Sequence, residues 1–190
     1  MLAGGRSVRF GADKLAADLG GIPLLQHAVR RVAEVCGDVV VVVAHDAAAP
    51  SPPPGIHVRV ARDAEEGKGP LAGLVAALAE VGSDLALVGA GDMPTMAPAV
   101  LREMLRVAGA VPVDAVALQD GEHVRPLPCV VSVDRARTDA HALLDMGVGS
   151  LRAMLDSLGV MAIDETTWRR LDPTGATLRD VDTPGDLPRR

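Results

Sequence analysis

The chain is poor in aromatic residues and in net positive charge, and each shortage excludes a class of function. Among its 190 residues, Phe10 and Trp168 are the only members of the Phe, Trp and Tyr group. Proteins that bind single-stranded nucleic acid usually stack bases on several such rings. A net charge of −6 also opposes broad binding to nucleic acid or to an anionic membrane surface. We therefore expect neither nucleic acid nor a membrane as a partner.

Cysteine is scarce as well, and long apolar runs are missing. Cys36 and Cys129 have no metal-ligand spacing and lie among apolar neighbours, which predicts reduced, buried thiols. Such thiols are typical of a reducing compartment. No apolar stretch reaches the roughly 18 residues of a membrane-spanning helix, and the N-terminus lacks the pattern of a signal peptide. The sequence therefore predicts a cytoplasmic protein.

Helical and extended patterns alternate along the chain. Apolar residues recur at helical spacing in 24–35, 71–81, 98–108, 135–146 and 150–158. Extended patterns occupy 39–44, 56–61, 85–88, 115–118, 124–133, a short stretch near Val160, and 178–181. The β-branched run 39–44 is typical of a strand buried on both faces of a parallel sheet. The alternation predicts one α/β domain over 1–190, a three-layer Rossmann-like sandwich with a mostly parallel sheet.

The segment from Leu2 to Lys14 is rich in glycine and in positive charge. Glycine lets backbone N–H groups approach phosphate oxygens closely, and Arg6, Arg9 and Lys14 add cations from side chains. The segment matches neither the Walker A pattern nor Gly-x-Gly-x-x-Gly. It therefore predicts a polyphosphate-binding loop of another kind, with an ordinary glycine-rich turn as the alternative.

The position of this loop in the chain is unusual. A phosphate-binding loop normally follows a buried strand, and here only Met1 precedes Leu2. Either the sheet forms without that strand, or a strand has been lost upstream of Met1. We favour the second interpretation, because the rest of the pattern is that of a protein that needs this strand.

Asp92 directly follows the predicted strand 85–88, in the sequence Gly91-Asp92-Met93-Pro94. Ligands of α/β proteins bind beyond the carboxyl ends of strands. Mg²⁺ prefers oxygen ligands and is usually held by one or two protein carboxylates together with substrate phosphates. Asp92 is thus a candidate Mg²⁺ ligand, and the alternative is a carboxylate that stabilises a turn or caps a helix.

Other acidic residues follow later extended segments. Asp63 ends one of them and could accept paired hydrogen bonds from a guanine edge, whereas Glu65 and Glu66 are better explained as a solvated loop. Asp180 and Asp182 lie at alternate positions of an expected strand end, so they would face the same way. One of the two could be a second metal ligand, or Asp182 could cap the last helix.

Neither a Ser/His/Asp nor a Cys/His arrangement is recognisable, so nothing in the sequence predicts a covalent nucleophile. This pattern fits a reaction in which an anionic phosphate attacks a nucleotide. Such a nucleophile is already ionised, and positioning and charge neutralisation then do most of the catalysis.

These motifs together resemble the nucleotidyltransferases of glycosyltransferase-A-like fold, and most closely the molybdenum cofactor guanylyltransferases. The resemblance covers nearly the whole chain and rests on six blocks in order: 2–14, 20–27, 69–74, 91–94, 125–127 and 180–187. It implies an α/β fold of the nucleotide-diphospho-sugar transferase type. It also implies transfer of GMP from GTP to the phosphate of molybdenum-bound molybdopterin, with release of pyrophosphate, and molybdoenzymes as further partners.

The resemblance assigns roles to individual residues. The nucleotide site would comprise Leu2, Ala3, Gly4, Gly5, Lys14, Asp63 and Asp92. In it, Leu2 to Gly4 would line the base and ribose, and Lys14 would bind phosphates. Asp92 would hold Mg²⁺ as the cofactor. Lys14, Asp92 and Arg9 would then be the catalytic residues.

One departure from the family pattern leaves the choice of guanine open. The family often has Asn after its second strand, where this chain has Ala44-His45. Cytidylyltransferase relatives tend to carry Ala-Ala-Gly and Gly-Asp-Gln-Pro, where this chain has Ala-Gly-Gly at 3–5 and Gly-Asp-Met-Pro at 91–94. These differences favour guanylyl transfer. A cytidylyltransferase, a transferase for another phosphate acceptor and a non-catalytic cofactor-delivery partner remain the rival interpretations.

Overall fold

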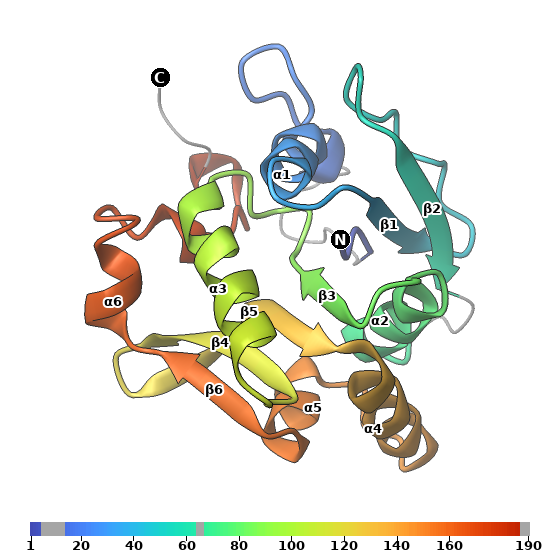
Figure 1. Ribbon diagram of the computed structural model, residues 1–190. Helices are drawn as coiled ribbons and strands as arrows, with labels where there is room; N and C mark the ends of the chain where they lie inside the picture. Colours follow the sequence, from blue (N-terminus) through green and yellow to red (C-terminus); the bar gives the residue numbers. More distant parts are fainter. Residues whose placement is uncertain (5–13, 64–66, 187–190) are drawn as a thin grey trace.

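The computed structural model describes residues 1–4, 14–63 and 67–186, and these form a two-stranded and a four-stranded sheet, joined through Leu2, with helices on both sides (Figure 1). The described strands are β1 (Val39–Ala44), β2 (Val58–Asp63), β3 (Leu85–Val88), β4 (Ala115–Asp120), β5 (His123–Ser132) and β6 (Val160–Ile163). The described α-helices are α1 (Leu24–Ala33), α2 (Pro70–Ala79), α3 (Pro98–Ala110), α4 (Val133–Asp145), α5 (Leu151–Ser157) and α6 (Glu165–Arg169).

Most strands run in one direction. β1 pairs in parallel with β2, and β4 pairs in parallel with β6. β5 is antiparallel to both of its neighbours, β3 and β4. Leu2 bridges the two halves, since it pairs in parallel with Val42 of β1 and with Ala90 just after β3. Among the strands that the structure describes, β5 alone runs the opposite way, so the predicted mostly parallel sheet is confirmed.

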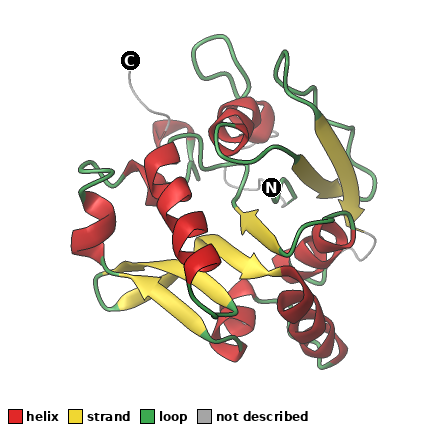
Figure 2. Cartoon of the chain, in the orientation of Figure 1, coloured by secondary structure: helices red, strands yellow, loops and turns green. Residues whose placement is uncertain are grey.

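Two sets of helices cover the two faces of the sheet, as the predicted three layers require (Figure 2). The continuous valine run of β1 shows why both faces are covered. Val39, Val41 and Val43 belong to a buried cluster with residues of α1 and α3. Val40 and Val42 point to the other side and pack near Ala77 of α2. Because successive side chains of a strand alternate, a strand apolar at every position needs a cover on each face.

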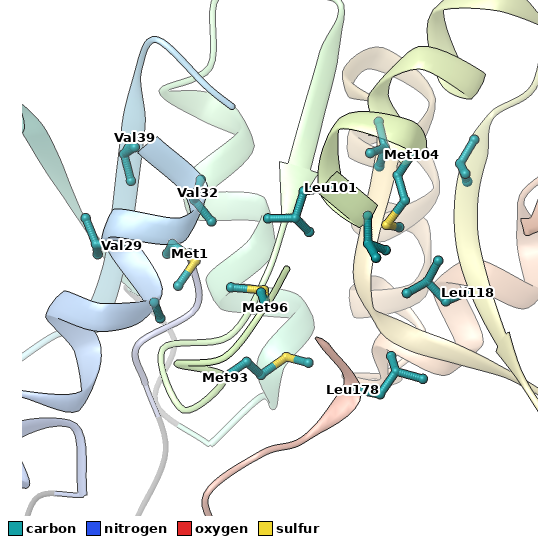
Figure 3. Packing of buried hydrophobic residues seen from close by; sticks show 14 of the residues in the cluster. Met1, Val29, Val32, Val39, Met93, Met96, Leu101, Met104, Leu118 and Leu178 are labelled. Carbon is teal, nitrogen blue, oxygen red and sulfur yellow. The ribbon is translucent and has the colours of Figure 1, made fainter. Parts of the chain in front are cut away.

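Methionine and aliphatic residues fill the core in place of aromatic rings. Met1, Met96 and Met104 are buried in the cluster between the sheet and the helices α1 and α3 (Figure 3). Unbranched, flexible methionine adapts to irregular gaps. The one tryptophan, Trp168, is fully buried, and its Nε1 donates to the carbonyl oxygen of Gln119 at 2.7 Å. Cys129 is buried as predicted, whereas Cys36 is partly exposed.

The first three residues take the place of a central strand. Met1 accepts a hydrogen bond from the N–H of Val42, Leu2 donates to the carbonyl of Gly89, and Ala3 donates to the carbonyl of Val42, at 2.8–2.9 Å. A cavity of about 490 Å³ lies beside Met1, between β1 and β3. The chain therefore joins the two halves of its sheet with a very short extended segment. The loss of a longer strand upstream of Met1 stays a prediction.

Three local expectations need correction. β2 begins and ends two residues later than the predicted segment 56–61. Helix α6 was not predicted, because five residues are too few to show helical spacing. Residues 178–181 are not a strand: a 3₁₀ turn covers Ala176–Leu178, and the chain continues without strand pairing.

Candidate functional site

A cleft of about 840 Å³ opens where β1 and β3 end. Leu2, Ala3 and Gly4 form part of its floor, between Ala44 at the end of β1 and Ala90 just after β3. Neighbouring parallel segments end at the same edge of a sheet, so segments distant in sequence meet there. A cleft of this size has room for a nucleotide-sized ligand.

Three charged side chains meet in this cleft. Lys14 Nζ lies 2.7 Å from Asp92 Oδ2 and 3.2 Å from Asp182 Oδ1. Lys14 and Asp92 are mostly enclosed, with about a fifth of each side chain exposed (19% and 21%), whereas the side chain of Asp182 is 51% exposed. One ammonium thus bridges two carboxylates that come from distant parts of the chain.

Lys14 remains a cation in this setting. Partial burial acts to lower the pKa of Lys14, but hydrogen bonds to Asp92 and Asp182, together with their negative charges, outweigh it and raise the pKa above its ordinary value. The group therefore stays protonated throughout the neutral range.

Close packing after β3 aims Asp92 into the cleft. The N–H of Gly91 donates to the Leu2 carbonyl at 2.8 Å, which ties the segment to the floor of the cleft. A Cβ atom at Gly91 would lie 2.8 Å from the side chain of Leu25, so the approach requires glycine or a shift of Leu25. The carbonyl of Asp92 accepts from the N–H of Val181 at 2.9 Å. This last bond brings Asp182 to the same place.

Polar residues that sequence reasoning missed anchor the C-terminal segment. Thr95 donates to the Ala176 carbonyl at 2.9 Å, and the N–H of Ala97 donates to Thr177 Oγ1 at 3.1 Å. The buried carboxylate of Asp172 accepts from both the N–H and the hydroxyl of Thr177, at 2.7 and 2.8 Å. These hydrogen bonds lower the pKa of Asp172 although burial acts to raise it. They hold the segment that carries Asp182.

Residues 1–162 match the family model described as MobA-like NTP transferase domain. This chain belongs to the MobA-like NTP transferase family. Curated relatives extend the match over nearly the full length. A probable molybdenum cofactor guanylyltransferase of Chloroflexus aggregans is 31% identical, covering 98% of this chain and 89% of that protein. One of Mycobacterium avium is 33% identical, covering 98% of this chain and 91% of that protein.

Solved structures share the family's fold. The molybdopterin-guanine dinucleotide biosynthesis protein A of Archaeoglobus fulgidus superposes with a TM-score of 0.77 at 22% identity, covering 98% of this chain and 92% of that chain. The 2-C-methyl-D-erythritol 4-phosphate cytidylyltransferase of Thermus thermophilus gives a TM-score of 0.68 at 18% identity, covering 92% and 90%. These likenesses confirm the expected nucleotidyltransferase type of α/β fold.

Most of the site residues predicted from the sequence lie together in the structure. Leu2, Ala3, Gly4, Lys14 and Asp92 all line the cleft. Their places agree with the predicted nucleotide site, and their roles stay predictions. Gly5 and Arg9 lie outside the described residues, as do Arg6, Glu65 and Glu66.

Two of the acidic candidates do not lie in the cleft wall. Asp63 ends β2 and does not line the cleft. Its carboxylate lies beside Gly73 of α2, so contact with a bound nucleotide stays a prediction. Asp180 is exposed and does not line the cleft, whereas Asp182 does. Asp180 and Asp182 were expected to face the same way at the end of a strand. Because this segment is not a strand, the two side chains do not share a face, and only Asp182 contacts Lys14.

The charged group suits a hard divalent cation. Asp92 and Asp182 present carboxylate oxygens to one cation-sized position, which Lys14 Nζ now contacts. Within the ranges that the structure describes, no cluster of three or more His, Cys, Asp or Glu residues could hold a metal. Two carboxylates are nevertheless what Mg²⁺ needs from a protein when phosphates and water complete its shell. The residues present therefore fit Mg²⁺ delivered together with a nucleotide.

The rest of the cleft wall is mostly apolar, with Gln26 and Ser51 as its polar members. Its apolar members include residues of the loop after β1, Pro70 at the start of α2, Leu127 and Leu151. Pro70 and Leu127 lie in two of the blocks that carry the family resemblance, 69–74 and 125–127, whereas no pattern in the sequence marked the alanines of the loop after β1. Among the described helices, none is long and apolar enough to cross a bilayer.

Proposed function

We propose that this protein transfers GMP from GTP to the phosphate of molybdopterin and releases pyrophosphate. One observation carries the proposal: Lys14 and Asp92 meet in a nucleotide-sized cleft at the ends of β1 and β3. The names of the curated relatives, molybdenum cofactor guanylyltransferases, supply the donor and the acceptor.

The chain's own residues would contribute mainly charge and position. The Lys14 ammonium can move from the two carboxylates to the phosphates of the donor, because it lies in the cleft and stays protonated. Asp92 and Asp182 would hold Mg²⁺, which when bound neutralises charge on the α-phosphate and on the leaving pyrophosphate. The acceptor phosphate is already ionised, so no base is required. Arg9 is proposed to assist from outside the described residues.

Guanine as the base is the finer part of the proposal. Met93 and the Ala-Gly-Gly sequence at 3–5 stand where cytidylyltransferase relatives tend to have Gln and Ala-Ala-Gly. Cytidylyl transfer on the same fold is the second candidate, favoured by the similarity to the Thermus thermophilus cytidylyltransferase structure. The proposal also includes cytoplasmic action and molybdoenzymes as recipients of the product.

Nucleotide titration separates the two candidates. With Mg²⁺ present, GTP is expected to bind at least about tenfold more tightly than CTP or UTP, a difference of about 1.4 kcal/mol. Isothermal titration calorimetry measures all three affinities on one preparation. Tighter binding of CTP would replace the guanylyl proposal with the cytidylyl one. A titration without Mg²⁺ serves as the control and is expected to show weaker GTP binding.

A further inference from the structure

Lys14 enters the cleft from η1, a single 3₁₀ turn that covers Lys14–Ala16. One backbone hydrogen bond closes this turn, in which the N–H of Ala17 donates to the Lys14 carbonyl at 3.1 Å. A single turn is marginal by itself in water, because ordering its backbone costs more than one hydrogen bond returns. The direction of the Lys14 side chain therefore depends on what holds η1 in place.

The ion pairs of Lys14 fix its ammonium only while the cleft holds no nucleotide. Asp92 and Asp182 contact the ammonium at 2.7 and 3.2 Å. In the proposed reaction the ammonium moves from these carboxylates to the donor phosphates, and it then loses both contacts. Its position in the nucleotide complex is therefore set by η1 and by the chain that follows η1. The inference below rests on the proposed function in this one step.

Residues 17–23 connect η1 to α1 in a compact turn. Within it, the N–H of Leu19 donates to the Ile22 carbonyl at 2.9 Å. The carboxylate of Asp18 accepts from the N–H of Gly21, also at 2.9 Å. Gly21 has a φ of +84°, a conformation that glycine adopts without strain. Because the 17–23 turn is bonded internally, it can shift as one unit and carry η1 with it.

Two hydrogen bonds join the 17–23 turn to α1. The N–H of Leu24 donates to the Ala17 carbonyl at 2.9 Å. About one helical turn further along, Nε2 of His27 lies 2.8 Å from the Leu19 carbonyl oxygen, in a partly buried position. A carbonyl oxygen can only accept, so Nε2 of His27 carries the proton and donates. The imidazole thus fixes the middle of the turn to the helix.

We propose that His27 is a positioning residue that keeps Lys14 directed at the donor phosphates. By donating to Leu19, it holds the 17–23 turn on α1 and so limits the movement of η1. His27 does not line the cleft, so its effect on a bound nucleotide passes through this turn. The proposal gives a role to the histidine that ends block 20–27 of the family resemblance.

Three substitutions isolate the hydrogen bond. His27→Leu removes the donor and keeps an apolar side chain of moderate size. His27→Gln places an amide Nε2 at a similar distance from the backbone, so it can restore the bond to Leu19. His141 is the matched control, since it is an exposed histidine on α4 outside the cleft wall. His141→Leu therefore makes the same chemical change without touching the 17–23 turn.

The experiment is a double-mutant cycle between His27 and Lys14, measured as GTP affinity by calorimetric titration with Mg²⁺. His27→Leu is expected to weaken GTP binding about fivefold, the effect of one modest hydrogen bond. The loss stays moderate because Leu15 also anchors η1 by packing against the core. In the Lys14→Met background, His27→Leu is expected to change the affinity less than about twofold, since no ammonium remains to be positioned. His27→Gln and His141→Leu are expected within about twofold of wild type.

Thermal melts check that each variant folds, and several affinity results would overturn the proposal. Equal losses from His27→Leu in the two backgrounds would mean that His27 acts independently of Lys14. An unchanged affinity in His27→Leu, or an equal loss in His27→Gln, would exclude the hydrogen bond as the cause. Should His27→Leu fail to fold, His27→Met decides in its place, with the same expected results.

The outcome for wild type separates this proposal from the proposed function. GTP binding by wild type with no transfer to molybdopterin would defeat the proposed function alone, while the double-mutant cycle still decides the role of His27. Absence of any GTP binding by wild type would defeat both.

Discussion

Asp92→Asn is expected to slow nucleotidyl transfer about a thousandfold, equivalent to about 4 kcal/mol of transition-state stabilisation. The substitution keeps the shape of the side chain but removes the negative charge that lies 2.7 Å from Lys14. An amide oxygen is a much weaker ligand for a hard cation than a carboxylate. Steady-state pyrophosphate release, with GTP, molybdopterin and Mg²⁺ supplied, measures the loss.

Two neighbouring aspartates provide the comparison. Asp182→Asn is expected to reduce the rate about tenfold, because this carboxylate is half-exposed and lies farther from Lys14, at 3.2 Å. Asp180→Asn makes the same chemical change on an exposed residue outside the cleft wall and is expected to leave the rate unchanged. A wild-type rate in Asp92→Asn would contradict the role of Asp92 in the reaction, whereas no pyrophosphate release by wild type would favour the alternative of a non-catalytic cofactor-delivery partner.

The layered fold could be predicted because local patterns and the final packing agree. The valine run of β1 requires a cover on both faces, and α1, α2 and α3 provide it. The antiparallel direction of β5 was implicit in the Asp120-Gly121 turn, which joins it to β4 as a hairpin. Helix α6 has a local cap, since Asp164 accepts from the N–H of Thr167, but its five residues are too few to show helical spacing in the sequence.

The site could be predicted only in part, because much of it depends on contacts between distant segments. Asp92 was recognisable from its place directly after a strand. Asp182 was uncertain among the residues near the C-terminus, and the contact that selects it spans 168 positions to Lys14. That contact depends on Thr177 and Asp172, whose hydrogen bonds hold the last segment against the turn after β3. No short motif encodes such an arrangement.

The alanine-rich cleft wall formed by the loop after β1 shows a second reason why the site could be predicted only in part. Ala47, Ala48 and Ala49 are unremarkable in a chain rich in alanine, and the sequence assigns them no chemistry. Their main-chain groups become important only when the loop after β1 folds against the cleft. Arg62 was likewise one arginine among many until the structure placed three carbonyl oxygens around its Nη1. A cluster of main-chain carbonyl oxygens leaves no trace in the side-chain pattern of the sequence.

Lys14→Met is expected to have two effects of opposite sign. Without nucleotide, the Lys14 ammonium occupies the position between Asp92 and Asp182 that a divalent cation would take. Its removal leaves two carboxylates without this counter-charge, so the affinity for Mn²⁺ alone should rise about tenfold. Transfer from GTP should nevertheless fall roughly 100- to 1,000-fold, because the cation that neutralises the donor phosphates is lost.

Electron paramagnetic resonance titration with Mn²⁺ and pyrophosphate release measure the two effects of Lys14→Met separately. Lys14→Arg is the control: it keeps the charge, so Mn²⁺ affinity should stay near that of wild type while the rate falls less than in Lys14→Met. An unchanged Mn²⁺ affinity in Lys14→Met would mean that the ammonium does not compete for the two carboxylates. Loss of a purely structural lysine would lower both the Mn²⁺ affinity and the transfer rate, or neither. A rise in Mn²⁺ affinity together with a fall in rate therefore requires a lysine that contacts the two carboxylates without nucleotide and the donor phosphates when nucleotide is bound.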